Sequence, residues 1–397
     1  MRVLMVSDVY FPRVNGVSTS IETFRLALAA HGVDVRLVVP RYGAEDEAAG
    51  ILRVPGRRVP SDPEDRLVRW GAMHRAVAGA AVGCDLIHVQ TPFVAHYAGL
   101  AAARQRGVPV LATYHTLFEE YLQYYAQWVP AEWLKGLARR LSRQQCNALD
   151  AIVVPSTAMA SRLAGYGVTV PLQVLPTGIP LGRFAGGDGP AFRAALGIAP
   201  ERPVALFVGR VAHEKNIGFL LEALVTTRQQ CPGALLLITG EGPAMADLQR
   251  QAAVLGLDDG VRFVGYLDRD RELPDCYAAA DAFVFASRTE TQGLVLLEAM
   301  AAGLPVIGLA AMGTTDILAP GRGCFVPPDH PQAFGAMLAH FFNHPQAWAH
   351  LGAEARAYAE EWSDGAMAAR LATLYRQLAA ARTLGPTSAV AVRSGIC

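Results

Sequence analysis

Lysine and cysteine are both scarce in this sequence. Only Lys135 and Lys215 are lysines, and all other basic residues are arginine. The six cysteines are scattered, without a Cys-x-x-Cys pair or a Cys/His cluster, at Cys84, Cys146, Cys231, Cys276, Cys324 and Cys397. This spacing argues against a disulfide or zinc framework and favours a reduced cytoplasmic protein with buried thiols.

Long apolar runs and excess charge are missing as well. No stretch reaches eighteen consecutive apolar residues, and the N-terminal run MRVLMVSDVYFP is too short for a signal peptide. We therefore expect no transmembrane helix, so any membrane contact must be peripheral. The 35 basic residues balance the 35 acidic ones, which gives no global indication of nucleic-acid binding.

The balanced charge hides a difference between the two halves of the chain. Residues 1–180 carry 18 basic and 14 acidic side chains, and the remainder carries 17 and 21. A chain of 397 residues with 52% hydrophobic content is long enough to form two domains with large cores. The first domain is therefore expected to be net positive.

Short apolar strands alternate with helical patterns in two successive sets. The strands of the first set are RVLMVSD, DVRLVVP, DLIHVQ, VPVLATYH and AIVVPS. Those of the second set are VALFVGR, ALLLITG, VRFVGY, AFVFAS and LPVIGL. A Pro/Gly-rich connector near residues 171–190 separates the sets. The pattern predicts an α/β fold of two doubly wound Rossmann-like domains, with ligands in the cleft between them at the carboxyl ends of strands.

The stretch SRTETQGLVLLEAMAAGLPVIG, residues 287–308, contains two glutamates eight positions apart. Thr291, Gln292 and Gly293 suit the start of a helix better than its interior. We therefore expect Glu290 in a loop and Glu298 just over one turn inside the helix. Free backbone N–H groups at such a helix start bind anions, and both glutamates would touch the ligand.

Basic residues follow the first strand of the second set, in GRVAHEKNI. Arg210 offers a planar fork and Lys215 a compact, rotatable ammonium, and together they suit a diphosphate. A solvated surface position is the alternative for Lys215 alone. In the first set, Asn15 and Gly16 permit a tight turn with close approach of the backbone, although a turn by itself needs no ligand.

These segments together carry a resemblance that covers residues 1 to about 380. The motifs NGV, GRVAHEKNI, GEGP, VRFVGY and ETQGLVLLEAMAAGLPVI resemble those of retaining nucleotide-sugar glycosyltransferases of family 4, group 1. That family includes sucrose synthase-like and phosphatidylinositol mannosyltransferase-like enzymes. The resemblance implies the GT-B fold, with a C-terminal helix that returns to the first domain. The predicted divisions are an acceptor-side domain (1–175), a nucleotide-sugar domain (176–360), the returning helix (361–381) and a flexible tail (382–397).

The resemblance also implies a role for each candidate residue of the second domain. Glu298 would hydrogen-bond the ribose hydroxyls of the donor, and Glu290 would contact the transferred sugar. Arg210 and Lys215 would neutralise charge on the leaving diphosphate. Three consecutive backbone N–H groups would bind the pyrophosphate, those of Gly293, Leu294 and Val295.

In the first domain, the resemblance points to a loop glycine and a histidine. Gly16 would let its loop close over the phosphates. His115, at the end of VLATYHT, resembles the family's active-site histidine that faces the donor sugar. A lone histidine after an apolar strand is otherwise more often a core residue.

Two further motifs resemble ligand-binding sequences but give weaker indications of function. GEGPAM begins like a dinucleotide fingerprint, but Met245 stands at the third glycine position and no acidic ribose ligand follows. The Asp268-Arg269-Asp270 tripeptide has the form of a metal-binding motif, but we expect it in a surface loop away from the donor site. No metal and no cofactor beyond the nucleotide-sugar co-substrate is expected.

The segment after His115, residues 113–144, is dense in aromatic residues: Phe118, Tyr121, Tyr124, Tyr125, Trp128 and Trp133. Pro130 fits the first turn of a helix. Apolar residues recur at every fourth position on one face of that helix (Trp133, Leu137 and Leu141), and basic residues on the opposite face (Lys135, Arg139 and Arg143), with Arg140 nearby. A basic amphipathic helix with tryptophans suits an anionic membrane surface. The alternative is an ordinary helix with its apolar face in the core.

The implied function is transfer of a hexose to a lipid such as diacylglycerol on the cytoplasmic face of the membrane. The start of the segment 113–144 and residues 287–300 also resemble the diacylglycerol glucosyltransferase branch of the family. UDP-glucose is the preferred donor, and GDP-mannose the second choice. Soluble or polyprenyl acceptors and a non-catalytic sugar-nucleotide-binding protein remain alternatives. Retention by front-face attack is expected, with the departing β-phosphate taking the acceptor's proton.

Overall fold

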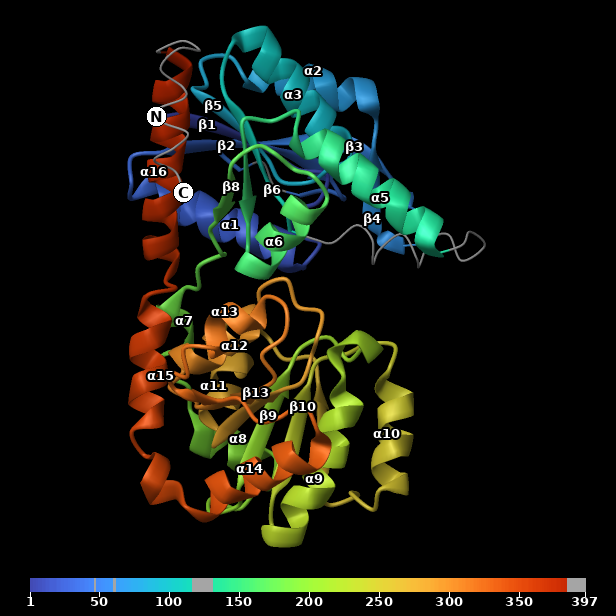
Figure 1. Ribbon diagram of the computed structural model, residues 1–397, viewed down its shortest axis with the longest axis vertical. Coiled ribbons are helices and arrows are strands. Elements are labelled where there is room, and N and C mark those ends of the chain that lie inside the picture. Colours follow the sequence, from blue (N-terminus) through green and yellow to red (C-terminus); the bar gives the residue numbers. More distant parts are fainter. Residues whose placement is uncertain (46–47, 60–61, 116–130, 384–397) are drawn as a thin grey trace. The chain divides into compact units, whose positions relative to one another are not determined.

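The computed structural model describes residues 1–45, 48–59, 62–115 and 131–383. The chain divides into two compact units (Figure 1). Unit 1 comprises Met1–Gly178 and the chain from Asp364 onward, and unit 2 comprises Ile179–Ser363. The predicted tail, 382–397, starts within the last helix, α16 (Asp364–Thr383), and otherwise lies outside the described residues.

Unit 1 is built on a mainly parallel sheet. Among its described residues, the strand order is β4-β3-β2-β1-β5-β6-β7-β8, and only the β3–β4 pair is antiparallel. The strands are β1 (Arg2–Val6), β2 (Asp34–Arg41), β3 (Ile51–Val59), β4 (Asp62–Val68), β5 (Leu86–Val89), β6 (Val110–Thr113), β7 (Ala151–Val154) and β8 (Leu172–Val174). The apolar runs correctly predicted the buried strands β1, β2, β5, β6 and β7. The polar β3 and β4 were missed, and so was the edge strand β8, which lies in the segment expected to be a connector.

Helices connect and cover these strands, as expected for a doubly wound fold. They are α1 (Gly16–Ala29), α2 (Trp70–Ala80), α3 (Val94–Arg106), α5 (Ala131–Cys146) and α6 (Thr157–Gly165). Helix α1 begins where the Asn15 side chain accepts a hydrogen bond from the Ser18 backbone N–H at 2.8 Å. This cap satisfies one of the donors that a helix start leaves without a partner.

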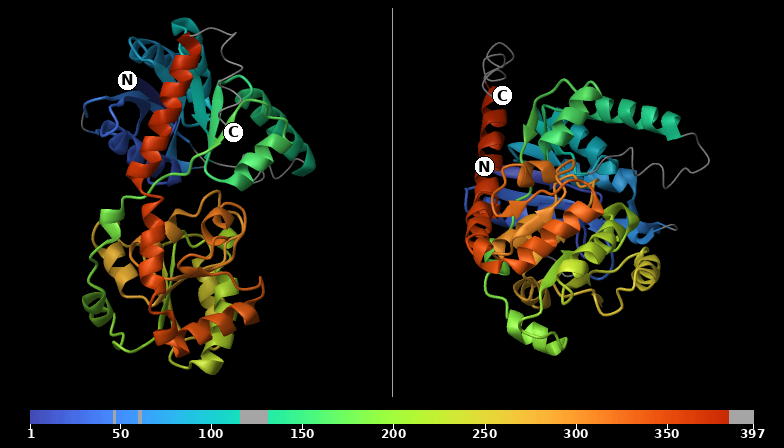
Figure 2. Two further views of the ribbon diagram at one scale, coloured as in Figure 1. Left: turned by 60° about the vertical axis from the view of Figure 1, so that its left-hand side comes forward. Right: turned by 60° about the horizontal axis from the view of Figure 1, so that its bottom comes forward.

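Helix α16 is the last described element and packs alongside α1 in unit 1 (Figures 1 and 2). Its Met367, Leu371 and Tyr375 join the same buried cluster as Ile21 and Phe24 of α1. Since the side chains come from the two ends of the sequence, their burial ties the C-terminal helix to unit 1.

Unit 2 contains a fully parallel sheet with the order β11-β10-β9-β12-β13-β14. Its strands are β9 (Val204–Val208), β10 (Leu235–Thr239), β11 (Val261–Gly265), β12 (Ala282–Phe285), β13 (Val306–Gly308) and β14 (Cys324–Phe325). Its helices are α7 (Leu181–Phe184), α8 (Gly189–Ala195), α9 (Ile217–Gln230), α10 (Met245–Val254), α11 (Glu272–Ala278), α12 (Leu294–Ala301), α13 (Thr314–Leu318), α14 (Pro331–Asn343) and α15 (Leu351–Glu360). The first five strands were predicted from their apolar runs, and the two-residue β14 was not.

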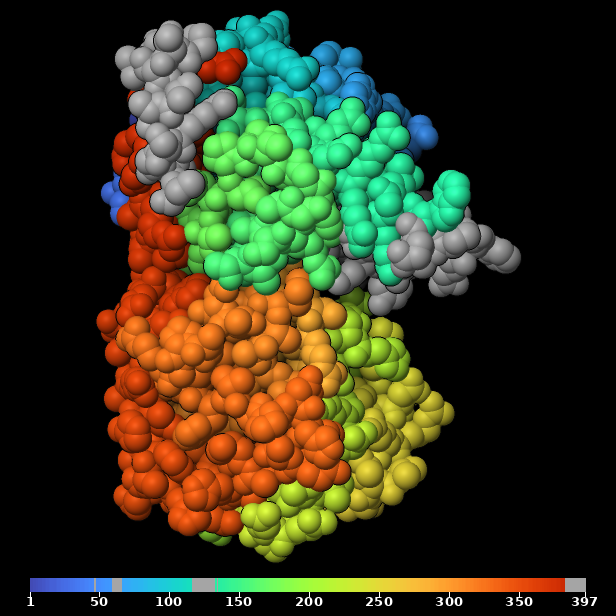
Figure 3. Space-filling model, viewed as in Figure 1, coloured from blue at the N-terminus to red at the C-terminus, as the bar shows by residue number. Residues whose placement is uncertain are grey.

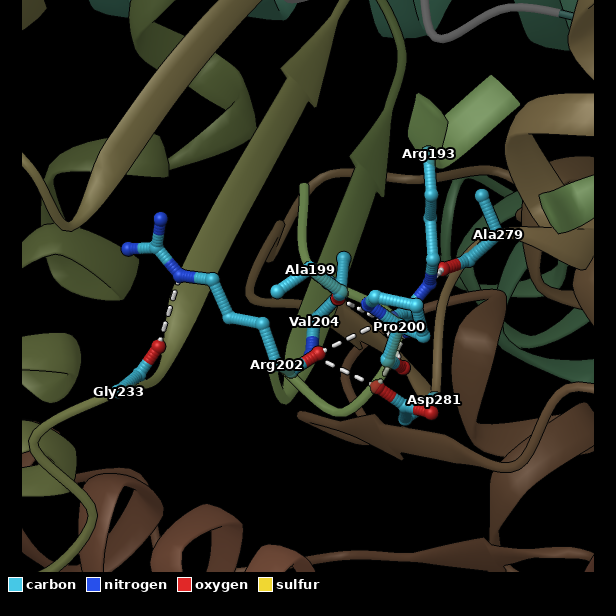
Figure 4. Close-up of polar contacts among 8 residues, drawn as sticks. All are labelled: Arg193, Ala199, Pro200, Arg202, Val204, Gly233, Ala279 and Asp281. Atoms are coloured by element: carbon cyan, nitrogen blue, oxygen red, sulfur yellow. Dashed lines mark hydrogen bonds and ion pairs between the residues drawn. The ribbon is translucent and has the colours of Figure 1, made fainter. Parts of the chain in front are cut away.

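One buried arginine ties several connections of unit 2 together (Figure 4). Arg193, on α8, donates to the carbonyl of Ala279 at 2.7 Å and to the carboxylate of Asp281 at 2.9 Å. It also donates to three carbonyls in the turn before β9, those of Ala199, Pro200 and Arg202. Asp281 in turn accepts from the Val204 N–H at 2.8 Å. The guanidinium therefore joins α8 to the starts of β9 and β12.

Candidate functional site

Helix α12 begins where the sequence predicted it. Gly293 caps the helix with a φ of 95°, a left-handed conformation that favours glycine. Glu290 lies in the preceding loop, and Glu298 lies inside the helix with 4% of its surface exposed. The first-turn N–H groups of a helix have no intrahelical acceptor, so residues 293–295, which lie between the two glutamates in the sequence, can donate to an anion.

Both carboxylate oxygens of Glu298 are held by protein groups. Arg269 Nη2 donates to Oε1 at 2.6 Å, and the buried Tyr277 hydroxyl donates to Oε2 at 3.0 Å. Burial raises the pKa of the Tyr277 hydroxyl well above its usual range, and the Glu298 charge raises it further. The glutamate is thus oriented by two donors from a neighbouring loop and helix.

The structure brings Glu290 and Lys215 together. Lys215 Nζ donates to Glu290 Oε1 at 2.5 Å, and both side chains are mostly buried. Sequence spacing did not predict this pair, because the residues are 75 positions apart. Arg210 is 66% exposed and lies 4.0 Å from Glu214. The two basic residues therefore differ, since Lys215 is held against Glu290 and Arg210 reaches solvent.

Two glycines of the GEGP motif are explained by close backbone crossing. A Cβ on Gly240 would lie 2.0 Å from the Gly209 carbonyl oxygen, and one on Gly242 would lie 2.3 Å from that of Val211. The loop after β10 thereby packs against the loop after β9 that carries Arg210 and Lys215. The glycines support this site without any dinucleotide role.

The expectation that Asp268-Arg269-Asp270 lies away from the donor-site glutamates is wrong, because Arg269 contacts Glu298. Asp268 accepts from the backbone N–H groups of Asp270 and Arg271, at 3.0 Å each. Asp270 pairs with Arg183 at 3.0 Å. Within the part of the chain that the structure describes, no group of three potential metal ligands occurs. Both aspartates therefore have structural contacts in a turn that presents Arg269.

In unit 1, His115 follows strand β6 as predicted. Its Nε2 lies 3.0 Å from the Gln90 amide oxygen, and Gln90 follows the adjacent strand β5. Since that oxygen only accepts hydrogen bonds, Nε2 carries the proton. Burial lowers the pKa of the ring to about 4, so His115 is neutral near pH 7. Gln90 was not predicted, although its position after a buried strand was a signal.

Asp8 is a second polar residue at this sheet edge that the sequence analysis missed. It follows β1 and accepts hydrogen bonds from the Thr91 hydroxyl at 2.8 Å and from the Ala95 N–H at the start of α3. Burial raises the pKa of its carboxyl to about 6, although these hydrogen bonds oppose the shift. Gly16 is the first residue of α1, and a Cβ there would meet no described atom within 4 Å. Packing in the described structure therefore does not require glycine at this position.

Helix α5 lies at the surface of unit 1 (Figures 1 and 3), and one of its faces carries exposed apolar residues. Trp133, Leu137 and Leu141 are 79%, 52% and 44% exposed. The face turned toward the core carries Ala138, Ser142 and Cys146 instead. The alternative of an apolar face packed in the core is therefore wrong.

The basic residues of α5 lie beside the apolar stripe rather than on a separate solvent face. Arg139, Arg140 and Arg143 are exposed, whereas Lys135 is partly buried. Arg139 lies over the Tyr166 ring, 5.8 Å from its centroid. The predicted aromatic residues Phe118, Tyr121, Tyr124, Tyr125 and Trp128, and Pro130, lie outside the described residues.

Exposed aromatic side chains adjoin the C-terminal end of α5. The Trp70 and Tyr97 rings lie 5.4 Å apart, and they are 53% and 40% exposed. Gln145 of α5 donates to the Tyr97 hydroxyl at 3.2 Å and to the carbonyl of Pro92 at 2.8 Å, next to the exposed Phe93. In the described ranges, no helix has the length and apolarity that crossing a membrane requires.

Comparisons with known proteins agree with this arrangement. The family model described as "Glycosyltransferase Family 4" matches residues 14–183, and that of "Glycosyl transferases group 1" matches residues 188–358. The chain is 32% identical to alpha-monoglucosyldiacylglycerol synthase of Streptococcus pneumoniae over 77% of this chain and 70% of that protein. It is 31% identical to the GDP-mannose-dependent alpha-mannosyltransferase of Mycobacterium tuberculosis over 90% of each chain.

Solved structures share the fold at low sequence identity. HepE of Anabaena, crystallised in complex with UDP, superposes with a TM-score of 0.75 at 19% identity, covering 94% of this chain and 99% of that one. Sucrose-phosphate synthase of Thermosynechococcus elongatus gives 0.74 at 24% identity, covering 96% and 99%. With both halves of the chain matched in order, this protein belongs to the family 4, group 1 glycosyltransferases of the GT-B fold and is a hexosyltransferase.

Proposed function

We propose that the protein transfers glucose from UDP-glucose to diacylglycerol or a similar lipid, with retention of the anomeric configuration. The observation that carries the donor half is the start of α12, where Glu290 of the preceding loop pairs with Lys215 and Glu298 lies just over one turn inside the helix. Two relatives named alpha-monoglucosyldiacylglycerol synthase, at 32% and 29% identity, favour glucose as the transferred sugar and diacylglycerol as the acceptor. The mannosyltransferase relative favours GDP-mannose as the second candidate.

The charges around α12 suit a departing diphosphate. The non-bridging oxygens of this diphosphate would meet the N–H groups of residues 293–295, Lys215 and the exposed Arg210. The ion pair with Glu290 holds Lys215 in place, which lowers the reorganisation needed as charge develops on the leaving group. Glu290 carries this ammonium on one oxygen, so its remaining acceptor sites are available to sugar hydroxyls.

We propose front-face attack, in which the acceptor oxygen bonds to the anomeric carbon as the bond to the β-phosphate breaks. The β-phosphate oxygen takes the proton of the acceptor hydroxyl. His115 contributes as a neutral ring, because its lowered pKa keeps it uncharged. With Nε2–H donated to Gln90, Nδ1 accepts a hydrogen bond from a hydroxyl of the donor sugar.

We propose a peripheral membrane location through helix α5. Its exposed Trp133, Leu137 and Leu141 would enter the interfacial region of the bilayer, and the neighbouring arginines would meet anionic headgroups. Trp70 and Tyr97 add an aromatic pair of the kind enriched at membrane interfaces. A lipid acceptor requires such docking, because its reacting hydroxyl stays at the membrane surface.

Product analysis with purified protein tests the proposal. Diacylglycerol in mixed micelles is incubated with UDP-glucose or GDP-mannose, and the lipid product is identified by mass spectrometry and its anomeric configuration by NMR. We expect α-glucosyldiacylglycerol from UDP-glucose. Glu298→Gln should raise the donor KM, whereas the exposed Glu222→Gln on α9 should leave it unchanged. A mannolipid would support the second candidate, and a β-linked product would refute retention.

A further inference from the structure

Glu298 has a defined number of hydrogen-bonding positions left for a ligand. An ionised carboxylate offers about four lone-pair sites, two on each oxygen. Arg269 occupies one site on Oε1, and Tyr277 occupies one on Oε2. One site on each oxygen therefore remains, which matches two neighbouring hydroxyl donors.

Arg269 is itself held in place by its own turn. The Asp268 carboxylate accepts from the consecutive backbone N–H groups of Asp270 and Arg271, and its own N–H donates to Glu272 at 2.8 Å. Asp270 is tied to Arg183 on α7. The Glu298 charge raises the pKa of the Arg269 guanidinium further above its usual range. These contacts fix the backbone of the turn, so that only the side-chain torsions of Arg269 remain to be ordered when it pairs with Glu298.

We propose that Arg269 is a positioning residue for the donor, which orients the Glu298 carboxylate so that its two remaining sites accept the 2′ and 3′ hydroxyls of the nucleotide ribose. Tyr277 assists from the other oxygen. The inference rests on the proposed donor-binding role of Glu298. What it adds is the assignment of Arg269, with Tyr277, as the group on which ribose binding by Glu298 depends.

A purely structural ion pair would behave differently. Removing such a pair would lower the unfolding temperature. Any change in affinity would then be the same for a ribonucleotide and for its 2′-deoxy form. A positioning role couples the effect of removing Arg269 to the effect of removing the 2′ hydroxyl, since the ribose hydroxyls bind well only while Arg269 holds the carboxylate. The coupling between Arg269 and the 2′ hydroxyl is therefore the quantity to measure.

The experiment is calorimetric titration of the full chain with UDP, GDP and their 2′-deoxy forms. Wild type is compared with Arg269→Ala, Arg269→Lys and Tyr277→Phe. Arg322→Ala is the matched control, because it removes another Arg–Glu pair of unit 2, the one with the exposed Glu361. Thermal unfolding of each variant is followed alongside.

For the preferred nucleotide, loss of the 2′ hydroxyl should weaken binding to wild type by about 10-fold or more, as expected for one hydrogen bond to a charged group. In Arg269→Ala the ribonucleotide itself should bind about 10-fold more weakly, and the 2′-deoxy penalty should fall below about threefold. Arg269→Lys should recover part of the affinity, and Tyr277→Phe should reduce the penalty less than Arg269→Ala.

A full 2′-deoxy penalty in Arg269→Ala and Arg269→Lys would overturn the inference. So would unchanged ribonucleotide affinity in either variant. Should Arg269→Ala fail to fold, Arg269→Lys and Tyr277→Phe decide the question by the same comparison. If wild type binds neither UDP nor GDP, the proposed donor function itself falls, and the inference falls with it for that separate reason.

Discussion

Replacing the apolar stripe of α5 should abolish binding to membranes. The change is Trp133, Leu137 and Leu141 to glutamine, which keeps a good helix former at each position. Burying a fully exposed large apolar side chain contributes about 1.5–3 kcal/mol. With 79%, 52% and 44% of these residues exposed, the stripe has roughly two side chains' worth of surface to bury, or about 3–5 kcal/mol.

Because each 1.4 kcal/mol is tenfold, the partition coefficient should fall by about 10² to 4 × 10³. Co-sedimentation with vesicles of neutral and anionic lipid measures it. Arg139, Arg140 and Arg143 to alanine should lose about 1 kcal/mol per arginine on anionic vesicles only, and less in high salt.

The matched control replaces three exposed apolar residues that do not form a stripe, Leu26, Val82 and Val254, with glutamine. It should sediment as wild type does. Equal sedimentation of wild type and the stripe variant would refute the membrane proposal and leave a soluble acceptor as the better hypothesis.

Three other predictions concern charge and stability. Burial lowers the pKa of His88 to about 3, so between pH 6.5 and 3 the unfolded chain binds one more proton there than the folded protein. His88→Gln should therefore reduce the loss of stability on acidification by about 1.4 kcal/mol per pH unit. Urea unfolding at stepped pH measures this, and equal dependence of stability on pH in wild type and variant would contradict it. Arg193→Lys should destabilise unit 2 by about 2–4 kcal/mol, because the contacts of Arg193 with carbonyl groups and Asp281 need the guanidinium fork. The control Arg202→Lys, at a more exposed arginine, should cost less than about 1 kcal/mol. Similar losses of stability in the two variants would show that burial does not decide the effect. Lys215→Ala should lower kcat by about 10²–10³-fold with an intact fold, measured with saturating donor. Arg250→Ala, at an exposed arginine, serves as control. An unchanged kcat in Lys215→Ala would show that Lys215 does not stabilise the leaving group.

Local signals in the sequence determined most of the fold. Buried parallel strands read as continuous apolar runs because both faces of each strand are covered, and these runs located most strands of both sheets. The start of α12 was also local, since Gly293 adopts a left-handed conformation that few other residues tolerate. Strands β3 and β4, at one end of the unit 1 sheet, were missed because their charged residues, such as Arg57 and Arg58, interrupt any apolar pattern.

The contacts of the candidate site came only from the tertiary structure. The pairs Lys215–Glu290 and Arg269–Glu298 join residues 75 and 29 positions apart, and no local pattern encodes which loops a parallel sheet brings together. For this reason Asp268-Arg269-Asp270 looked like a distant surface loop until its arginine was found on Glu298. Tyr277 and Gln90 were missed for the same reason, because hydrogen bonds between neighbouring loops and strands decide their roles.

Helix α5 shows most directly what the sequence determined and what only tertiary packing decided. Its sequence determined an amphipathic helix, because Trp133, Leu137 and Leu141 recur at helical spacing. The spacing did not determine which face would meet the core. Small side chains at Ala138, Ser142 and Cys146 let the opposite face pack closely on unit 1, so tertiary packing left the large apolar side chains facing outward.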